Sequence, residues 1–214
     1  MRDYNARSML RHRIEIPSGR DGSAPLPTVV MMHGRGADMN DLADLAPLLD
    51  PAGGCRFVFP NAPRPWEASP GMTFGWTWFD GWPPESKSVA ASREVLLAFI
   101  DEITEKHPTT SLVIAGFSQG AMMALDAGLR HECAGIIAMS GGLYEPDLPA
   151  TLTRAPVLLA HGAMDDVVPV SYARRARLVL EERGLDVEYH EYPMAHQVAM
   201  EEAEAVKAFI ERVV

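Results

Sequence analysis

Apolar residues follow two rhythms along this chain. Short runs of β-branched and other apolar residues are continuous, as in strands of a parallel sheet that is buried on both faces. Longer segments between them repeat apolar residues at helical spacing, as in helices that cover such a sheet. The expected strands cover residues 28–32, 55–63, 111–117, 133–139, 155–161 and 186–193, and the expected helices cover residues 37–49, 85–107, 120–131, 170–183 and 196–214. This alternation predicts an α/β fold.

Two segments depart from these rhythms. The stretch "LRHRIEIP" at residues 10–17 mixes polar and apolar positions and predicts a strand at the edge of the sheet. Residues 60–84 have no period, yet they contain all four tryptophans of the chain together with Phe74 and Phe79. The sequence therefore predicts a long aromatic loop in this region, and a loop of that length calls for a functional reason.

Length and composition favour one globular unit. We expect a single domain over residues 1–214, with about nine flexible residues at its start, because this length can bury a large core. Apolar residues make up 47% and charged residues 22% of the chain, which excludes disorder as the default. No internal repeat or linker divides the sequence.

The charge of the chain excludes some partners. A formal net charge of −10 and a pI of about 5.1 disfavour nucleic acids and anionic membrane surfaces, which reward clustered Lys and Arg. Two cysteines, Cys55 and Cys133, are too few for a disulfide framework and lack the spacing of metal ligands. We expect both to be core thiols.

The start of the chain does not resemble a targeting segment. The residues "MRDYNARSMLRHR" lack the apolar centre of a signal peptide, and no later apolar run approaches the roughly 18 residues of a membrane span. We therefore expect no membrane span and a cytoplasmic location.

The pentapeptide G-F-S-Q-G directly follows the continuous strand "SLVIAGF" and opens a helical segment. A serine on a sharp turn from strand to helix is the setting of a nucleophile elbow, in which Ser118 projects above the sheet near a helix N-terminus. Gly116 and Gly120 would relieve the crowding around such a turn. On the pentapeptide alone, a glycine-rich turn with an N-capping serine fits equally well.

A serine nucleophile needs a base and an orienting carboxylate, which in this fold class follow in the order Ser, acid, His. Asp165 and Asp166 follow a buried strand, and His196 follows the last strand, so both positions lie at the carboxyl edge of the sheet. Periodicity alone does not separate the two aspartates. Among the other six histidines, His33 and His161 end buried strands before glycine and look like structural turn residues.

An oxyanion hole needs a second backbone donor from a loop after an early strand, and "MMHGRGAD" supplies such a loop. We expect the amide of Arg35 to act together with that of Gln119, the residue after the serine.

Several motifs together resemble one known family. They are "MMHGRGAD", "NAPRP", "WTWFD", "GFSQGAMMAL", "SGGL", "HGAMDDVVP" and "MAHQV". This set resembles the phospholipase/carboxylesterase family of α/β-hydrolases, which includes the acyl-protein thioesterases. The resemblance covers nearly the whole chain and implies an α/β-hydrolase fold with a mostly parallel sheet, helices on both faces and no separate cap domain.

The same resemblance implies the roles of the site residues. It makes Ser118 the nucleophile, Asp165 the acid, His196 the base, and the amides of Arg35 and Gln119 the oxyanion donors. The implied activity is hydrolysis of carboxylic esters, thioesters or lysophospholipid-type acyl esters through an acyl-Ser118 intermediate, without metal or organic cofactor. Members of the family are often dimeric, so a homodimer is an option, although no apolar stripe identifies an interface.

The aromatic segment and the Arg35 side chain are unusual within this pattern. We expect Trp78 or Phe79 to line an acyl or alcohol pocket, with Met72 and Trp76 as further candidates, because pocket walls are commonly aromatic. Packing of the segment onto the domain is the alternative. The Arg35 guanidinium fits either a carboxylate or phosphate of the substrate or a solvent-exposed position.

Three competing functions stay open at this point. A dienelactone-hydrolase-like enzyme would normally carry cysteine as its nucleophile, and peptidases of this fold usually add a large accessory domain. A non-catalytic module that binds small ligands usually loses a triad member, whereas this chain has all three. The sequence does not fix the substrate.

Overall fold

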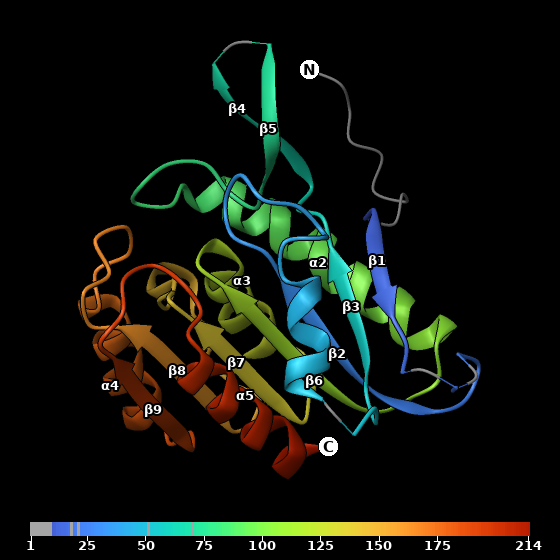
Figure 1. The fold of residues 1–214 in the computed structure, drawn as a ribbon. Coiled ribbons are helices and arrows are strands. Elements are labelled where there is room, and N and C mark those ends of the chain that lie inside the picture. The colour runs from blue at the N-terminus through green and yellow to red at the C-terminus, as the bar shows by residue number, and fades with distance from the viewer. Residues whose placement is uncertain (1–9, 18, 21, 51, 70) are drawn as a thin grey trace.

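The computed structural model describes residues 10–17, 19–20, 22–50, 52–69 and 71–214. Within these residues, seven strands form a central sheet in the order β1-β3-β2-β6-β7-β8-β9 (Figure 1). The strands are β1 His12–Glu15, β2 Leu26–Met32, β3 Arg56–Pro60, β6 Thr109–Phe117, β7 Gly135–Met139, β8 Val157–Gly162 and β9 Val187–Tyr192. β1 is antiparallel to β3 at one edge, as "LRHRIEIP" predicts, and all other neighbours are parallel.

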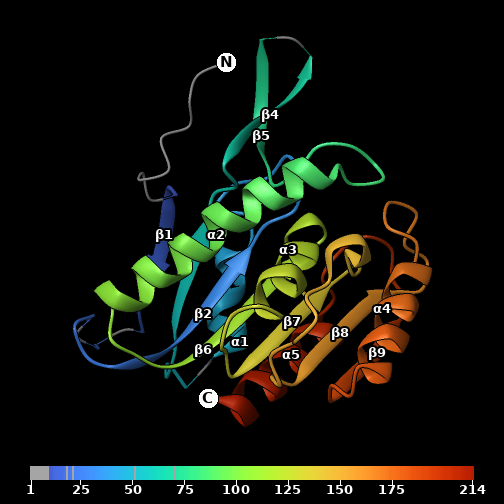
Figure 2. The same cartoon turned by 180° about the vertical axis from the view of Figure 1, so that it is seen from behind.

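Helices cover both faces of the sheet (Figures 1 and 2). One face carries η1 Ala43–Leu45, α1 Ala46–Leu49 and α5 Met200–Val213, which pack with one apolar cluster of the core. The opposite face carries α2 Ser86–Lys106, α3 Gln119–Gly128 and α4 Ser171–Glu182, with two further clusters. The helical periodicity of the sequence arises because each helix turns an apolar stripe toward the sheet, whereas α3 is buried on every side. The predicted α/β-hydrolase architecture is therefore present.

The helix expected over residues 37–49 is much shorter than predicted. Only a 3₁₀ turn and the four-residue helix α1 form there. The side chain of Asp38 accepts the amide of Asn40 at 2.8 Å, and this local bond competes with helical pairing of the backbone.

The aromatic stretch 60–84 is not a long loop. It contains an antiparallel hairpin of β4 Arg64–Ser69 and β5 Met72–Thr77, which projects beyond the edge of the sheet at which the parallel strands end (Figure 1). The pairing shifts register between Trp66 and Glu67 and again before Ser69. Each shift reverses the alternation of inward and outward side chains, which explains why the sequence has no period of two here.

The base of the hairpin packs on the loop that follows β2. The amide of Gly36 donates to the carbonyl of Trp76 at 2.8 Å, and the amide of Trp76 donates to Ala37 at 2.9 Å. A Cβ atom at Gly75 would collide with the carbonyl of Gly36, so only glycine allows this close approach. The hairpin thus braces the loop that contains Arg35.

Among the described residues, every helix is too short or too polar to cross a bilayer. The expected flexible start of about nine residues lies outside the described part of the chain.

Candidate active site

Ser118 lies on the sharp turn between β6 and α3. Its backbone adopts φ 57° and ψ −119°, a conformation that non-glycine residues rarely adopt and that costs about 1–3 kcal/mol. A Cβ atom at Gly116 would collide with the carbonyl of Gly120, and one at Gly120 would collide with the carbonyl of Met32. The glycines on both sides of the serine are therefore required by backbone packing, as the pentapeptide predicts.

The hydroxyl of Ser118 lies at the end of a row of hydrogen bonds. His196 Nε2 is 2.9 Å from Ser118 Oγ, and His196 Nδ1 is 2.7 Å from Asp165 Oδ2. The three side chains come from the turns after β6, β8 and β9, so the parallel strands bring them to one edge of the sheet. The ring of Phe117 contacts His196 with a centroid distance of 4.8 Å, which fixes the imidazole from one side.

The carboxylate of Asp165 is buried and fully used. Its Oδ1 atom accepts the amides of Val167 at 2.9 Å and Val168 at 2.8 Å, and its Oδ2 atom faces His196. Burial raises the pKa of Asp165, but the hydrogen bonds from His196 and from these amides outweigh burial and lower it below its usual value. Asp165, and not Asp166, thus makes the contacts expected of the acid.

The loop after β2 lies against the serine. A Cβ atom at Gly34 would stand 3.3 Å from Ser118 Cβ, so the backbone of this loop passes close to the hydroxyl. Within the described residues, no protein acceptor is paired with the amides of Arg35 and Gln119. The Gln119 amide begins helix α3, where the free N–H groups favour negative charge. Both amides are thus unpaired in the described part of the chain, and each belongs to a segment that adjoins Ser118.

A sequence profile of the phospholipase/carboxylesterase family matches residues 14–214. The chain belongs to the phospholipase/carboxylesterase family. It is also similar to an acyl-protein thioesterase 1 of Mycosarcoma maydis, with 33% identity over 91% of this chain and 94% of that protein. An acyl-protein thioesterase 1 of Saccharomyces cerevisiae is 28% identical over 86% of this chain and 92% of its own length.

Solved structures agree with the family assignment. The crystal structure of esterase PE8 has a TM-score of 0.84 and 32% identity, and the match covers 97% of this chain and 100% of that one. The Bacillus cereus carboxylesterase has a TM-score of 0.79 at 21% identity, with 98% and 97% coverage, and supports the fold alone. The predicted α/β-hydrolase fold and the predicted class, a hydrolase of the carboxylesterase or thioesterase type, are confirmed for this phospholipase/carboxylesterase family member.

Two further histidines of this family member are buried: His33 directly follows β2, whereas His161 lies within β8 and not in a turn as predicted. His33 is buried, accepts the amide of Ala62 on Nε2 at 3.0 Å, and lies 2.6 Å from the carbonyl of Gly34 on its other side. Burial lowers the pKa of His33, which keeps its ring neutral. His161 is fully buried and lies 2.7 Å from the carbonyl of Val168.

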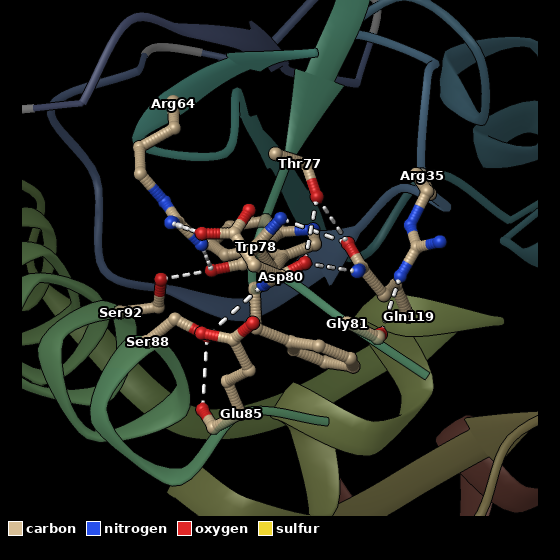
Figure 3. A network of polar contacts seen from close by, with 11 residues as sticks. Arg35, Arg64, Thr77, Trp78, Asp80, Gly81, Glu85, Ser88, Ser92 and Gln119 are labelled. Carbon is tan, nitrogen blue, oxygen red and sulfur yellow. Dashed lines mark hydrogen bonds and ion pairs between the residues drawn. The ribbon is translucent and has the colours of Figure 1, made fainter. Parts of the chain in front are cut away.

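The Gln119 side chain has a structural task that the sequence did not reveal. Its Oε1 atom accepts the amide of Trp78 at 2.8 Å and the hydroxyl of Thr77 at 3.1 Å, and its Nε2 atom donates to Phe79 at 2.7 Å (Figure 3). Helix α3 is thereby joined to the segment that follows β5. These partners lie some 40 positions earlier in the chain, so no local pattern signals them.

The Arg35 guanidinium belongs to the same surroundings. It donates to the carbonyl of Gly81 at 3.0 Å and so connects the loop after β2 with the loop after β5 (Figure 3). Arg64 donates to the carbonyl of Trp78 at 3.1 Å and pairs with Asp80. The guanidinium of Arg35 is thus exposed but bonded to another loop of the chain, rather than directed only to solvent.

The four side chains suggested for substrate contact have different positions. Trp78 and Phe79 are fully buried in the core, where Trp78 donates its indole N–H to the carbonyl of His33 at 2.9 Å. Both belong to an apolar cluster of the core and offer no surface to a ligand in this structure. Trp76 is half-buried beside the loop after β2, whereas Met72 is 55% exposed on the projecting hairpin.

An apolar groove of about 570 Å³ lies next to the start of α3. Its walls come from the loop after β5, the start of α2, α3, the segment after β7 and α4. The lining residues are Pro83, Pro84, Ser86, Met122, Leu143, Tyr144, Glu145, Pro146, Ser171, Tyr172 and Arg175. Met122 donates its amide to the carbonyl of Ser118 at 3.2 Å, so the groove begins one helical turn from the serine. The Trp82 and Tyr172 rings, 5.2 Å apart, join two of its walls.

The described residues contain no group of three or more His, Cys, Asp or Glu side chains that could hold a metal ion.

Proposed function

We propose that this family member is a serine hydrolase that cleaves carboxylic esters or thioesters through an acyl-Ser118 intermediate. The observation that carries the proposal is the row of hydrogen bonds from Asp165 through His196 to Ser118, with distances of 2.7 and 2.9 Å. A serine hydroxyl is a weak nucleophile by itself, and a base within hydrogen-bond reach that is oriented by a carboxylate activates it.

In the acylation step, Ser118 Oγ attacks the substrate carbonyl carbon while His196 Nε2 takes the hydroxyl proton. The negative charge that develops on the carbonyl oxygen is stabilised by the amides of Arg35 and Gln119, each donor contributing about 3–4 kcal/mol. The bond to the leaving alcohol or thiol then breaks, and His196 returns the proton to it. A water molecule, deprotonated by His196, releases the acid and restores Ser118.

Asp165 acts through the imidazole. Its lowered pKa keeps the carboxylate ionised at neutral pH, so it can stabilise the imidazolium that forms in both steps. The two valine amides on Oδ1 hold the carboxylate plane, and Oδ2 fixes which imidazole nitrogen faces the serine.

The groove beside α3 is the proposed place for an apolar part of the substrate. Its walls are mainly proline, leucine, methionine and tyrosine side chains. The names of the relatives, acyl-protein thioesterase and esterase, favour acyl substrates of this kind. Of the four side chains suggested by sequence, Trp76 remains a proposed contact, because its backbone pairs with the loop that bears Arg35.

The decisive experiment is a hydrolysis panel of p-nitrophenyl esters and acyl-CoA thioesters from C2 to C16, run with the natural chain and with Ser118→Ala. A fluorophosphonate probe should label the natural chain and not the variant. Ser111→Ala, at the opposite end of β6, serves as the matched control and should retain both labelling and activity.

We expect Ser118→Ala to lose hydrolysis by a factor of at least about 10³. A short-chain optimum would identify a small-ester carboxylesterase, and a long-chain or thioester optimum would identify a deacylase of lipids or acyl proteins. Hydrolysis that survives in Ser118→Ala would refute the nucleophile assignment. Failure of the probe to label any serine would favour a non-catalytic binding module.

A further inference from the structure

His161 is a second histidine beside the proposed acid. It lies in β8, is fully buried, and its Nε2 atom is 3.4 Å from Asp165 Oδ2. The same Nε2 atom is 2.7 Å from the carbonyl oxygen of Val168. A buried ring so close to the row of hydrogen bonds that ends at Ser118 has to be in a defined protonation state.

The surroundings of the ring determine which nitrogen carries the proton. The Nδ1 atom is buried and has no hydrogen-bond partner in the described part of the chain, whereas Nε2 faces a carbonyl oxygen. A proton on Nδ1 would leave a buried donor unpaired and would place two acceptors 2.7 Å apart. The neutral ring with the proton on Nε2 satisfies both constraints.

The groups around the ring have opposing effects on the pKa of His161. Burial lowers the pKa of His161, while the Val168 carbonyl and Asp165 raise it, His196 lowers it and Glu191 of β9 raises it. Burial is the largest of these effects, and the net pKa lies below the usual value for histidine. His161 therefore donates one hydrogen bond from Nε2 without carrying charge at neutral pH.

The hydrogen bond from His161 to the Val168 carbonyl matters because the amide of the same residue binds Asp165. The Val168 amide donates to Asp165 Oδ1 at 2.8 Å, next to the amide of Val167 at 2.9 Å. When His161 fixes the carbonyl of Val168, both polar groups of that residue are restrained. The turn from Asp165 to Val168 is thus closed around one carboxylate oxygen.

We propose that His161 is a positioning residue, whose neutral Nε2–H group holds Val168 so that two amides occupy Asp165 Oδ1 and leave Oδ2 to His196. The proposal rests on the proposed function, since it gives a second histidine the task of orienting the acid. A side chain that merely fills space would need no donor at this point. The task requires a donor at the position of Nε2 and no charge.

Two amide variants separate a donor from a space-filling side chain. Gln places its amide near the position of Nε2, and Asn places its amide near that of Nδ1. We expect His161→Gln to stay within about threefold of the natural kcat and His161→Asn to lose about 10- to 100-fold, with KM for p-nitrophenyl acetate unchanged. The acidic limb of the kcat/KM profile should move to lower pH in His161→Asn, because the imidazolium of His196 loses part of its carboxylate partner.

A thermal melt shows whether each variant is folded. Equal kcat values and equal pH profiles for the two folded variants would overturn the proposal, because the donor at Nε2 would then be irrelevant. Loss of melting temperature in both, with an unmoved pH profile, would identify a purely structural residue.

A measurement on the natural chain does not depend on the folding of any variant. In ¹⁵N-labelled protein at neutral pH, the imidazole nitrogens of His161 should report a proton on Nε2 and a bare Nδ1. A proton on Nδ1, or a ring that carries protons on both nitrogens at neutral pH, would also overturn the proposal. If Ser118→Ala retains activity, the proposed function fails, whereas an inactive Ser118→Ala beside a fully active His161→Asn refutes the role of His161 alone.

Discussion

At the scale of single residues, the site depends on backbone positions where only one conformation fits. Ser118 has a positive φ of 57° because the chain reverses sharply there between strand β6 and helix α3. The strain is tolerated because Gly116 and Gly120 carry no side chains that would force the two elements apart.

The first residue-scale prediction concerns Gly120. A methyl group there would collide with the carbonyl of Met32 in β2, so we expect Gly120→Ala to lower the free energy of unfolding by at least about 3 kcal/mol. Gly54→Ala is the matched control, because a Cβ atom at Gly54 meets only Asp50 Oδ1 at 3.8 Å. Urea denaturation measures both variants. A Gly120→Ala chain as stable as Gly54→Ala would contradict the crowding of the turn.

The second residue-scale prediction concerns Glu202, a fully buried carboxyl group in the first turn of α5. Burial raises its pKa from 4.5 to about 8, against the opposing effect of the Ala199 backbone. Between about pH 4.5 and about pH 8, the folded chain therefore keeps a proton on Glu202 that the unfolded chain releases. The free energy of unfolding consequently falls as pH rises through this range.

Glu202→Gln, which stays neutral, should be more stable than the natural chain at pH 9 by roughly 2–5 kcal/mol and similar to it at pH 4. Urea denaturation at both pH values tests this difference. Glu201→Gln, at an exposed neighbouring position, should leave the pH dependence unchanged. A constant difference between Glu202→Gln and the natural chain across this range would disprove the raised pKa.

Sequence reasoning was most successful at this scale where a residue adjoins the end of a strand. Ser118, Asp165 and His196 each follow a recognisable strand, and the carboxyl ends of parallel strands meet at one edge, so their encounter could be expected. The burial of Trp78 could not be expected from the sequence. Whether an aromatic ring faces a ligand or the core depends on elements that are distant in sequence. The donors and acceptors around Gln119 are distant in the same way.

At the scale of secondary structure elements, the main finding is the hairpin β4–β5 and its attachment to the site. Alternating or continuous apolar runs identified the strands of the central sheet, but the bulged pairing of the hairpin has neither pattern. The hairpin base pairs with Gly36 and Ala37, and the segment after it is bonded to Gln119. The segment therefore helps to hold both proposed oxyanion donors, the amides of Arg35 and Gln119.

Removal of the Gln119 side chain tests that attachment. In Gln119→Met the amide of Trp78, the hydroxyl of Thr77 and the carbonyl of Phe79 lose a partner, and we expect the free energy of unfolding to fall by about 2–5 kcal/mol. Thr77→Val removes one donor from the same group and should cost about 1 kcal/mol. Urea denaturation distinguishes the two. Equal effects would mean that the Gln119 amide does not hold the segment.

At the scale of the whole molecule, the net charge of −10 affects which substrates reach the site. Acyl-CoA thioesters carry several negative charges, and mutual repulsion slows their encounter at low ionic strength. We expect kcat/KM for acyl-CoA to rise several-fold between about 10 and 200 mM NaCl, while that for neutral p-nitrophenyl esters stays constant. A fall of kcat/KM for acyl-CoA with rising salt would instead reveal a local attraction between the enzyme and the acyl-CoA anion. The guanidinium of Arg35 would then be the first group to replace by mutation.

The sheet itself is divided by chain order. The strands β1, β3 and β2 all come from the first 60 residues, and β6 to β9 all come from residue 109 onward. The two groups meet where β2 pairs with β6, with Met32 opposite Gly116, and the loops bearing Arg35 and Ser118 leave the sheet at that boundary. Each of the two groups of strands therefore supplies one of the proposed oxyanion donors.

This boundary makes the fold suited to enzyme complementation. A chain divided between α2 and β6 would give one fragment with the Arg35 amide and the hairpin, and another with Ser118, Asp165 and His196. Neither fragment alone would possess both proposed oxyanion donors. Fusing the fragments to two proteins that bind each other would convert their association into ester hydrolysis, a reporter whose switch is the β2–β6 pairing.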